Sequence, residues 1–138
     1  MKASHHDFEV ELRDDWWSEA GMLGFKTSLN CYRGDASAFP NKQIFSVSIE
    51  EVEPVRRNLS AGVFNDNEEA SAHDRVVRIL RGFQADAEIP PVEVVSMSPD
   101  SRFKYKLVHG AHRFYCSLIA GFSHVPAVQG FDMSALDR

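Results

Sequence analysis

The chain has 138 residues, of which 43% are hydrophobic and 25% charged, and its formal net charge is −5. This length and balance suit one soluble globular domain and argue against a disordered chain. The net charge argues against a protein coated in positive charge for nucleic acid, and no apolar run reaches the roughly 18–20 residues of a membrane span.

We expect a cytoplasmic protein. Residues 1–7 lack the apolar core of a secretory signal. Cys31 and Cys116 are too few for a disulfide framework and fit a reducing compartment, although the sequence leaves a single bridge between them open.

Charge is distributed unevenly along the chain. Residues 1–53 hold five basic and ten acidic side chains, whereas residues 54–113 hold nine basic and eight acidic ones. The acidity therefore lies in the N-terminal third, and the arginines cluster in the middle.

The N-terminal third predicts a strand, a short helix and an irregular stretch. Residues 8–12 alternate apolar and acidic, as a half-buried strand does. Asp14 and Asp15 precede residues 16–20, which predicts a short helix with acidic residues at its positive end. Glycines and polar residues at 21–41 indicate irregular structure, and residues 43–48 predict a second strand.

Two pairs of adjacent residues near the N-terminus, one of histidines and one of tryptophans, lead to predictions about solvent exposure. We interpret His5 and His6 as part of a solvated terminus. Trp16 and Trp17 occupy adjacent helical positions and cannot both face one core, so we expect one to be exposed and to offer a homodimer contact.

A longer helix is predicted in the middle of the chain. Asp66 and Glu69 form a capping-box pattern, and the helix should continue to about Phe83. One face of this helix is apolar, with Val76, Val77, Ile79, Leu80 and Phe83. The opposite face carries a basic stripe, Arg75, Arg78 and Arg81.

The remaining elements are a hairpin, a helix and a strand. Residues 92–95 and 103–108 flank a turn at 98–101, with Lys104 and Lys106 facing water or a ligand and Phe103, Tyr105 and Leu107 facing the core. A helix should begin near Ala111, with an apolar face of Phe114, Tyr115, Leu118, Ile119 and Phe122, and end at Gly121 before a strand at 125–128. The order from residue 43 is strand, helix, strand, strand, helix, strand, which indicates an α+β fold on a mixed sheet.

The sequence His109-Gly110-Ala111-His112-Arg113 is the candidate functional loop. A strand ends there, a glycine turns the chain and a helix begins, so unpaired helix amides point outward and favour an anion, most often a phosphate. Arg113 is a cation at the positive end of a helix dipole, and an anionic ligand would explain its position. The alternative is a glycine turn followed by a surface arginine.

The motifs around this loop resemble those of the ParB/sulfiredoxin superfamily. The segment Ile89-Pro90-Pro91-Val92-Glu93-Val94-Val95, the loop itself, and Ala120-Gly121-Phe122-Ser123-His124-Val125-Pro126-Ala127-Val128 occur in the order and spacing of that family. Upstream, residues 49–58 look like the family's early strand with its Pro/Arg/Asn turn. The resemblance covers residues 43–130. It implies a ParB/sulfiredoxin-like domain at 43–138, preceded by an N-terminal strand-helix extension at 1–42.

The resemblance implies a phosphate site formed by His109, Gly110, Ala111, His112 and Arg113, which Arg56 or Arg57 approaches from the neighbouring turn. Two departures limit what is carried over. Ala111 stands where sulfiredoxins have their catalytic cysteine, so the reductase reaction lacks its nucleophile. ParB partition proteins continue into helix-turn-helix and dimerisation domains, and because this sequence stops at Arg138 we expect no such DNA-reading domain.

Two functional hypotheses from different classes follow. The first is a binding module that forms a homodimer and holds a nucleotide or nucleic acid independently of base sequence. Its contacts with the nucleic-acid backbone would be Arg75, Arg78, Arg81, Lys104 and Lys106. The alternative interpretation of these five residues is that they belong to a solvated helix face and a solvated strand surface.

The second hypothesis is a nucleotide hydrolase, phosphotransferase or nuclease that acts on a nucleotide with Mg²⁺. In this enzyme Arg113 would stabilise phosphoryl charge and His112 would act as an acid or base. Ligand spacing around His109, His112 and His124 predicts no resident metal.

Overall fold

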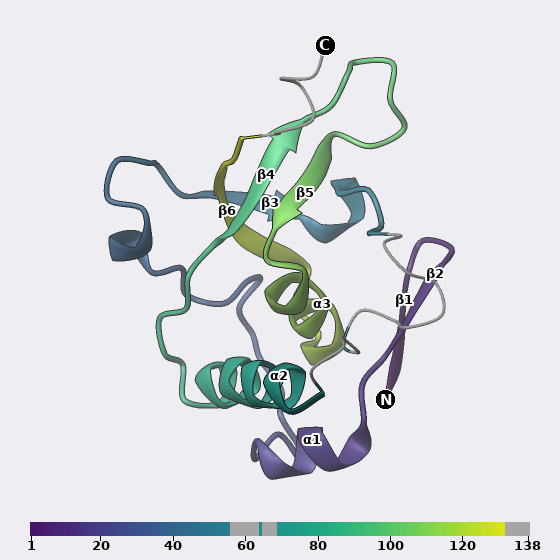
Figure 1. The fold of residues 1–138 in the computed structure, drawn as a ribbon, viewed down its shortest axis with the longest axis vertical. Coiled ribbons are helices and arrows are strands. Elements are labelled where there is room, and N and C mark those ends of the chain that lie inside the picture. The colour runs from purple at the N-terminus through teal and green to yellow at the C-terminus, as the bar shows by residue number, and fades with distance from the viewer. Residues whose placement is uncertain (56–63, 65–68, 132–138) are drawn as a thin grey trace.

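A mixed four-stranded sheet and a stack of helices make up the protein in a computed structural model, which describes residues 1–55, 64 and 69–131 (Figure 1). The sheet contains β3 (Phe45–Ser48), β4 (Val92–Ser96), β5 (Tyr105–His109) and β6 (His124–Gln129) in the order β3-β6-β4-β5. β6 pairs antiparallel with β3 and parallel with β4, and β4 pairs antiparallel with β5. The predictions of an α+β class and a mixed sheet are therefore confirmed.

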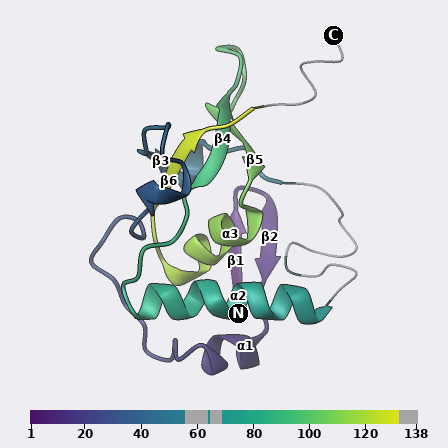
Figure 2. The same cartoon turned by 60° about the vertical axis from the view of Figure 1, so that its left-hand side comes forward.

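The helices lie below the sheet in succession. α3 (Ala111–Ala120) is next to the sheet, α2 (Glu69–Gln84) packs against α3, and α1 (Asp14–Glu19) packs against α2 (Figures 1 and 2). The predicted order of strands and helices from residue 43 onward is confirmed. Asp66 lies outside the described residues, so the capping box remains a prediction.

Helix α2 presents its apolar side to the core. Val76, Val77, Leu80 and Phe83 are buried, as predicted, and Ile79 is half-buried at the edge of this face. Arg75, Arg78 and Arg81 are exposed. Burial of the apolar stripe thus fixes the rotation of α2 and directs its arginines outward.

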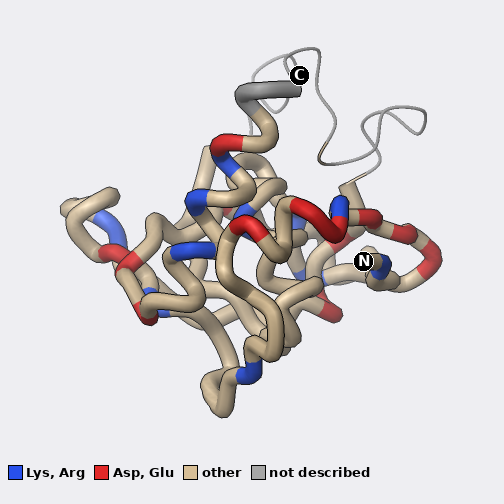
Figure 3. Tube along the Cα trace, turned by 90° about the horizontal axis from the view of Figure 1, so that it is seen from below, with Lys and Arg blue, Asp and Glu red and all other residues tan. Residues whose placement is uncertain are grey.

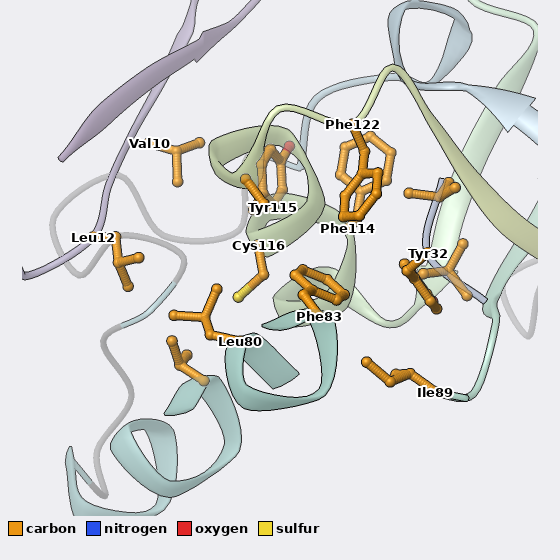
Figure 4. Close-up of a cluster of buried hydrophobic side chains, with 14 of the residues drawn as sticks. Val10, Leu12, Tyr32, Leu80, Phe83, Ile89, Phe114, Tyr115, Cys116 and Phe122 are labelled. Carbon is orange, nitrogen blue, oxygen red and sulfur yellow. The ribbon is translucent and has the colours of Figure 1, made fainter. Parts of the chain in front are cut away.

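Helix α3 is buried on more sides than the sequence predicted. Its buried residues are Phe114, Tyr115, Cys116, Ser117 and Ala120, whereas Leu118 and Ile119 are only half-buried. The predicted apolar face is therefore confirmed at Phe114, Tyr115 and Phe122 and only partly at Leu118 and Ile119. Cys116 and Ser117 are buried in addition because α3 contacts the sheet, α2 and the N-terminal hairpin at once. Figure 4 shows Phe114, Tyr115 and Cys116 pointing into a cluster with Leu80 and Phe83 of α2.

Residues 1–42 share this core. They form an antiparallel hairpin, β1 (Lys2–His5) with β2 (Phe8–Glu11), followed by α1 and a 3-10 helix at Ala36–Ala38. Val10, Leu12 and Met22 are almost completely buried. Both Trp16 and Trp17 are buried too, at 5% and 9% exposure, so the expectation of one exposed tryptophan was wrong. Trp16 and Trp17 occupy adjacent positions of the six-residue helix α1, so more than one face of this helix is covered.

The two cysteines are free thiols in this structure. Cys116 is completely buried, and burial raises the pKa of its thiol. Cys116 therefore packs as a core residue of α3.

His5 is buried, not solvated as the sequence suggested. Its Nε2 lies 2.9 Å from the carbonyl oxygen of Ile49, which can only accept, so Nε2 carries the proton. Its Nδ1 lies 3.3 Å from the hydroxyl of Tyr115 on α3. The ring therefore ties the N-terminal hairpin to the core.

Stability should fall when His5 becomes charged. Burial lowers the pKa of His5 below its usual value, so the unfolded chain takes up this proton at a higher pH than the folded one. The contribution of His5 is present above about pH 6.5 and is lost as the pH falls towards the folded-state pKa. Replacing His5→Asn should cost about 1–3 kcal/mol at neutral pH, and the difference from wild type should shrink on acidification, as measured by urea unfolding at several pH values.

The matched control is His73→Gln on α2. Hydrogen bonds to Glu19 and Asp74 raise the pKa of His73 above its usual value. Its stabilising effect is therefore present at low pH and lost as the pH rises, so the cost of His73→Gln should grow on acidification. Parallel pH dependences for the two variants would contradict the assignment of His5.

Candidate functional site

The loop between β5 and α3 has the conformation that its sequence predicted. Gly110 is left-handed, with φ 101° and ψ 30°, and α3 begins at Ala111. The amide of Phe114 donates to the carbonyl oxygen of Gly110 at 2.9 Å and closes the first turn. The amides of residues 111–113 precede this bond and have no acceptor inside the helix. No side chain of Gly110 can cap them.

Glycine is required at position 110 for a second reason. A Cβ atom there would lie 2.9 Å from Cγ1 of Val92 and 3.1 Å from Nη2 of Arg113. The absence of a side chain therefore lets the Arg113 guanidinium lie directly against the loop backbone.

A pocket of about 390 Å³ opens at this loop. Its walls come from α2 and from the loop with the first turn of α3, and its lining residues are Arg75, Arg78, Ile79, His109, Gly110, Ala111, His112 and Arg113. All five residues predicted from the loop and two of the three predicted from the basic stripe thus meet in one place. The sequence predicted both groups as contacts of one ligand but did not show that they lie side by side.

The pocket concentrates positive charge. Arg75, Arg78 and Arg113 line it, and among the described residues no carboxylate lies within ion-pair distance of any of the three. Other arginines do have partners: Arg33, for example, lies 3.6 Å from Glu88. Acidic residues gather instead along the chain near the N-terminus (Figure 3). Three guanidiniums with no carboxylate partner in the described part of the chain, next to the first turn of α3, form an arrangement that favours an anion.

Arg113 is held at one end of its guanidinium. Its Nη1 donates to the carbonyl oxygen of Pro90 at 3.3 Å, and its side chain lines the pocket. His112 also lines the pocket, and its ring stacks at a tilt of 32° on that of Phe64, with 5.8 Å between ring centroids. Phe64 is buried. A hydrogen bond therefore positions the Arg113 side chain, and a ring contact with Phe64 positions that of His112.

Three of the predicted basic contacts do not line the pocket. Arg81 donates through Nη2 to the carbonyl oxygen of Glu19 at 3.5 Å, towards α1. A three-residue step falls about 60° short of a full helical turn, so the stripe rotates away from the pocket between Arg75 and Arg81. Lys104 lies 3.8 Å from Glu51 in a separate depression beside the β4–β5 hairpin, and Lys106 is not among the pocket's lining residues.

The remaining expectations concern turns and carboxylates. Arg56 and Arg57 lie outside the described residues, so their approach to the pocket stays a prediction. The carboxylates of Asp74 and Glu93 contact His73 and Lys42, respectively, and do not line the pocket. In the part of the chain that the structure describes, no cluster of three or more His, Cys, Asp or Glu side chains could hold a metal ion.

Sequence reasoning missed two residues at this site. Ile79 lines the pocket as an apolar residue. Its position on α2, directly after Arg78, could have indicated that it lies at the same site. Tyr32 lies behind the pocket, where its hydroxyl donates to the same Pro90 oxygen at 2.7 Å. Nothing in the local sequence around Tyr32 indicated this contact.

Comparisons with protein-family models, curated proteins and solved structures gave no match to this chain. Within the described residues, no helix combines the length and the apolar character needed to cross a membrane.

Proposed function

We propose that this protein is a phosphate-binding module of the ParB/sulfiredoxin type that holds a nucleotide or a stretch of nucleic acid at the start of α3. The observation that carries the proposal is the pocket in which Arg75, Arg78 and Arg113 converge without a carboxylate partner among the described residues. Placing three like charges around one cavity is unfavourable unless an anion compensates them. Exposed amides of the first turn of α3 add donors aimed at the same anion.

The same arrangement supports recognition of the phosphate group over the base. Among the described lining residues, Ile79 and the small Ala111 are the apolar side chains, and the others are arginines, histidines and Gly110. Guanidinium groups match phosphate oxygens in a two-pronged geometry. Contacts of this kind position a nucleic acid without reading its sequence.

Binding should be strongly dependent on salt. We expect a short fluorescein-labelled single-stranded oligonucleotide to bind at about 50 mM salt, with log Kd rising by about 2 per tenfold increase in salt if three phosphate contacts form. Fluorescence anisotropy over a salt series measures this slope, and a second oligonucleotide of different sequence is the control for base reading. No binding at low salt, or binding that ignores salt, would contradict the proposal.

A second candidate function is hydrolysis or transfer of a phosphoryl group in the same pocket. The observation that favours it is that His109 and His112 line the pocket together with Arg113, which brings proton-transferring groups next to a charge-stabilising one. Incubation with ATP or CTP and Mg²⁺ tests it by release of inorganic phosphate. Turnover that persists unchanged in Arg113→Gln would count against this candidate.

A further inference from the structure

The N-terminal extension reaches the back of the candidate site. Residues 33–35 run beside Ile89: the amide of Ile89 donates to the carbonyl oxygen of Arg33 at 2.9 Å, and the amide of Asp35 donates to that of Ile89 at 2.8 Å. This bridge places Tyr32 next to Pro90, which lies two residues before the start of β4. A part of the chain outside the family resemblance therefore contacts the segment that holds Arg113.

Tyr32 is fixed in place by burial and ring packing. Its side chain is 3% exposed, and its ring lies 5.4 Å from that of Phe83 at a tilt of 30°. Burial raises the pKa of its hydroxyl far above the usual value, with the nearby charge of Arg113 acting in the opposite direction. The hydroxyl therefore stays protonated and remains a donor.

The carbonyl oxygen of Pro90 receives two donors. The Tyr32 hydroxyl reaches it at 2.7 Å and Nη1 of Arg113 at 3.3 Å. The shorter bond orients the carbonyl, and the carbonyl in turn anchors one end of the guanidinium. The other end, Nη2, lies against the position where Gly110 lacks a side chain.

We propose that Tyr32 is a positioning residue of the phosphate pocket: through the Pro90 carbonyl it holds the Arg113 guanidinium in the orientation that receives an anion. This inference rests on the proposed function. The N-terminal extension, through Tyr32, would then contribute a residue that positions the site. An anchored guanidinium loses less side-chain freedom on binding, so the phosphate meets a pre-arranged donor pair.

A double-mutant cycle tests the proposal with the oligonucleotide as probe. We expect Tyr32→Phe, which keeps the buried ring, to weaken binding by about threefold to tenfold, the equivalent of one hydrogen bond. In an Arg113→Gln background the same change should have no effect on affinity, because the group through which Tyr32 acts is gone. An equal loss in both backgrounds would overturn the proposal.

Two controls separate positioning from general destabilisation. Tyr105→Phe removes a hydroxyl on β5 outside the pocket lining and should leave binding unchanged. Leu12→Ala removes a completely buried side chain of the N-terminal extension that lies outside the pocket lining, and it should lower the melting temperature without a comparable loss of affinity. If Leu12→Ala weakens binding as much as Tyr32→Phe does, the effect is one of stability and the proposal fails.

A measurement on the unliganded protein keeps the test independent of variant folding. In ¹⁵N NMR spectra the guanidinium of Arg113 should show restricted rotation in the wild type, and this restriction should be lost in Tyr32→Phe. Free rotation in the wild type overturns the positioning role even if oligonucleotide binding is observed. Absence of oligonucleotide binding by the wild type overturns the proposed function, and the inference with it.

Discussion

Replacing Arg113→Gln should weaken binding of the labelled oligonucleotide by about tenfold to a hundredfold, since one charge-assisted contact is worth about 1.5–3 kcal/mol. Arg113 is the residue of the loop that combines a fixed charge, a place in the pocket lining and an anchored guanidinium. The salt dependence should fall as well, by about 0.7 in the slope of log Kd, because one phosphate contact is removed. Anisotropy titrations at several salt concentrations measure both effects.

The matched control for this prediction is Arg102→Gln. Arg102 is also an arginine of the β4–β5–α3 region, but its guanidinium lies over the ring of Phe103, 5.2 Å from the centroid, and outside the pocket. Its removal changes the net charge by the same amount and should leave the affinity close to that of the wild type. Equal losses in the two variants would mean that overall charge, not the pocket, determines binding.

Replacing Phe114→Ala should destabilise the protein by about 3–5 kcal/mol, a large part of the roughly 5–15 kcal/mol typical of a domain. The side chain of Phe114 is completely buried, and its ring centroid lies 4.9 Å from that of Tyr115 and 5.2 Å from that of His5. Its removal leaves a cavity where the sheet, α2 and the N-terminal hairpin meet on α3. Urea unfolding followed by circular dichroism gives the free energy of unfolding.

Leu29→Ala serves as the comparison for this stability measurement. Leu29 is 51% exposed, and its truncation should change the free energy of unfolding by less than about 0.5 kcal/mol. A loss below about 1 kcal/mol in Phe114→Ala would show that the region around α3 relaxes to fill the space.

The parts of the fold that sequence alone predicted are those whose signals are local. The glycine at 110 requires a left-handed turn, Gly121 ends α3 in the same conformation, and the apolar stripe of α2 sets which side is buried. Each depends on residues within a few positions of one another. For the same reason, the candidate loop and its geometry could be named before the structure was known.

The features that sequence alone did not predict depend on distant partners. Strand β1 has no apolar alternation, and the burial of His5 depends on Ile49 and Tyr115. The meeting of the loop with Arg75 and Arg78 depends on how α2 packs against α3, and the proposed role of Tyr32 depends on a bridge to Ile89. Hydrophobic periodicity carries no information about such contacts, because it reports which side of an element is buried and not what covers it.

Contacts between residues that lie far apart in the sequence have a consequence for the way the protein is made. His5 meets Tyr115 across 110 positions of sequence, and β3 has β6 as its partner in the sheet. While the chain is being synthesised, Val10 and Val47 emerge long before the residues that cover them. Closing such long loops costs entropy before any contact repays it, so folding should be slow for a protein of this size. The nascent chain therefore exposes apolar side chains that a ribosome-associated chaperone could bind.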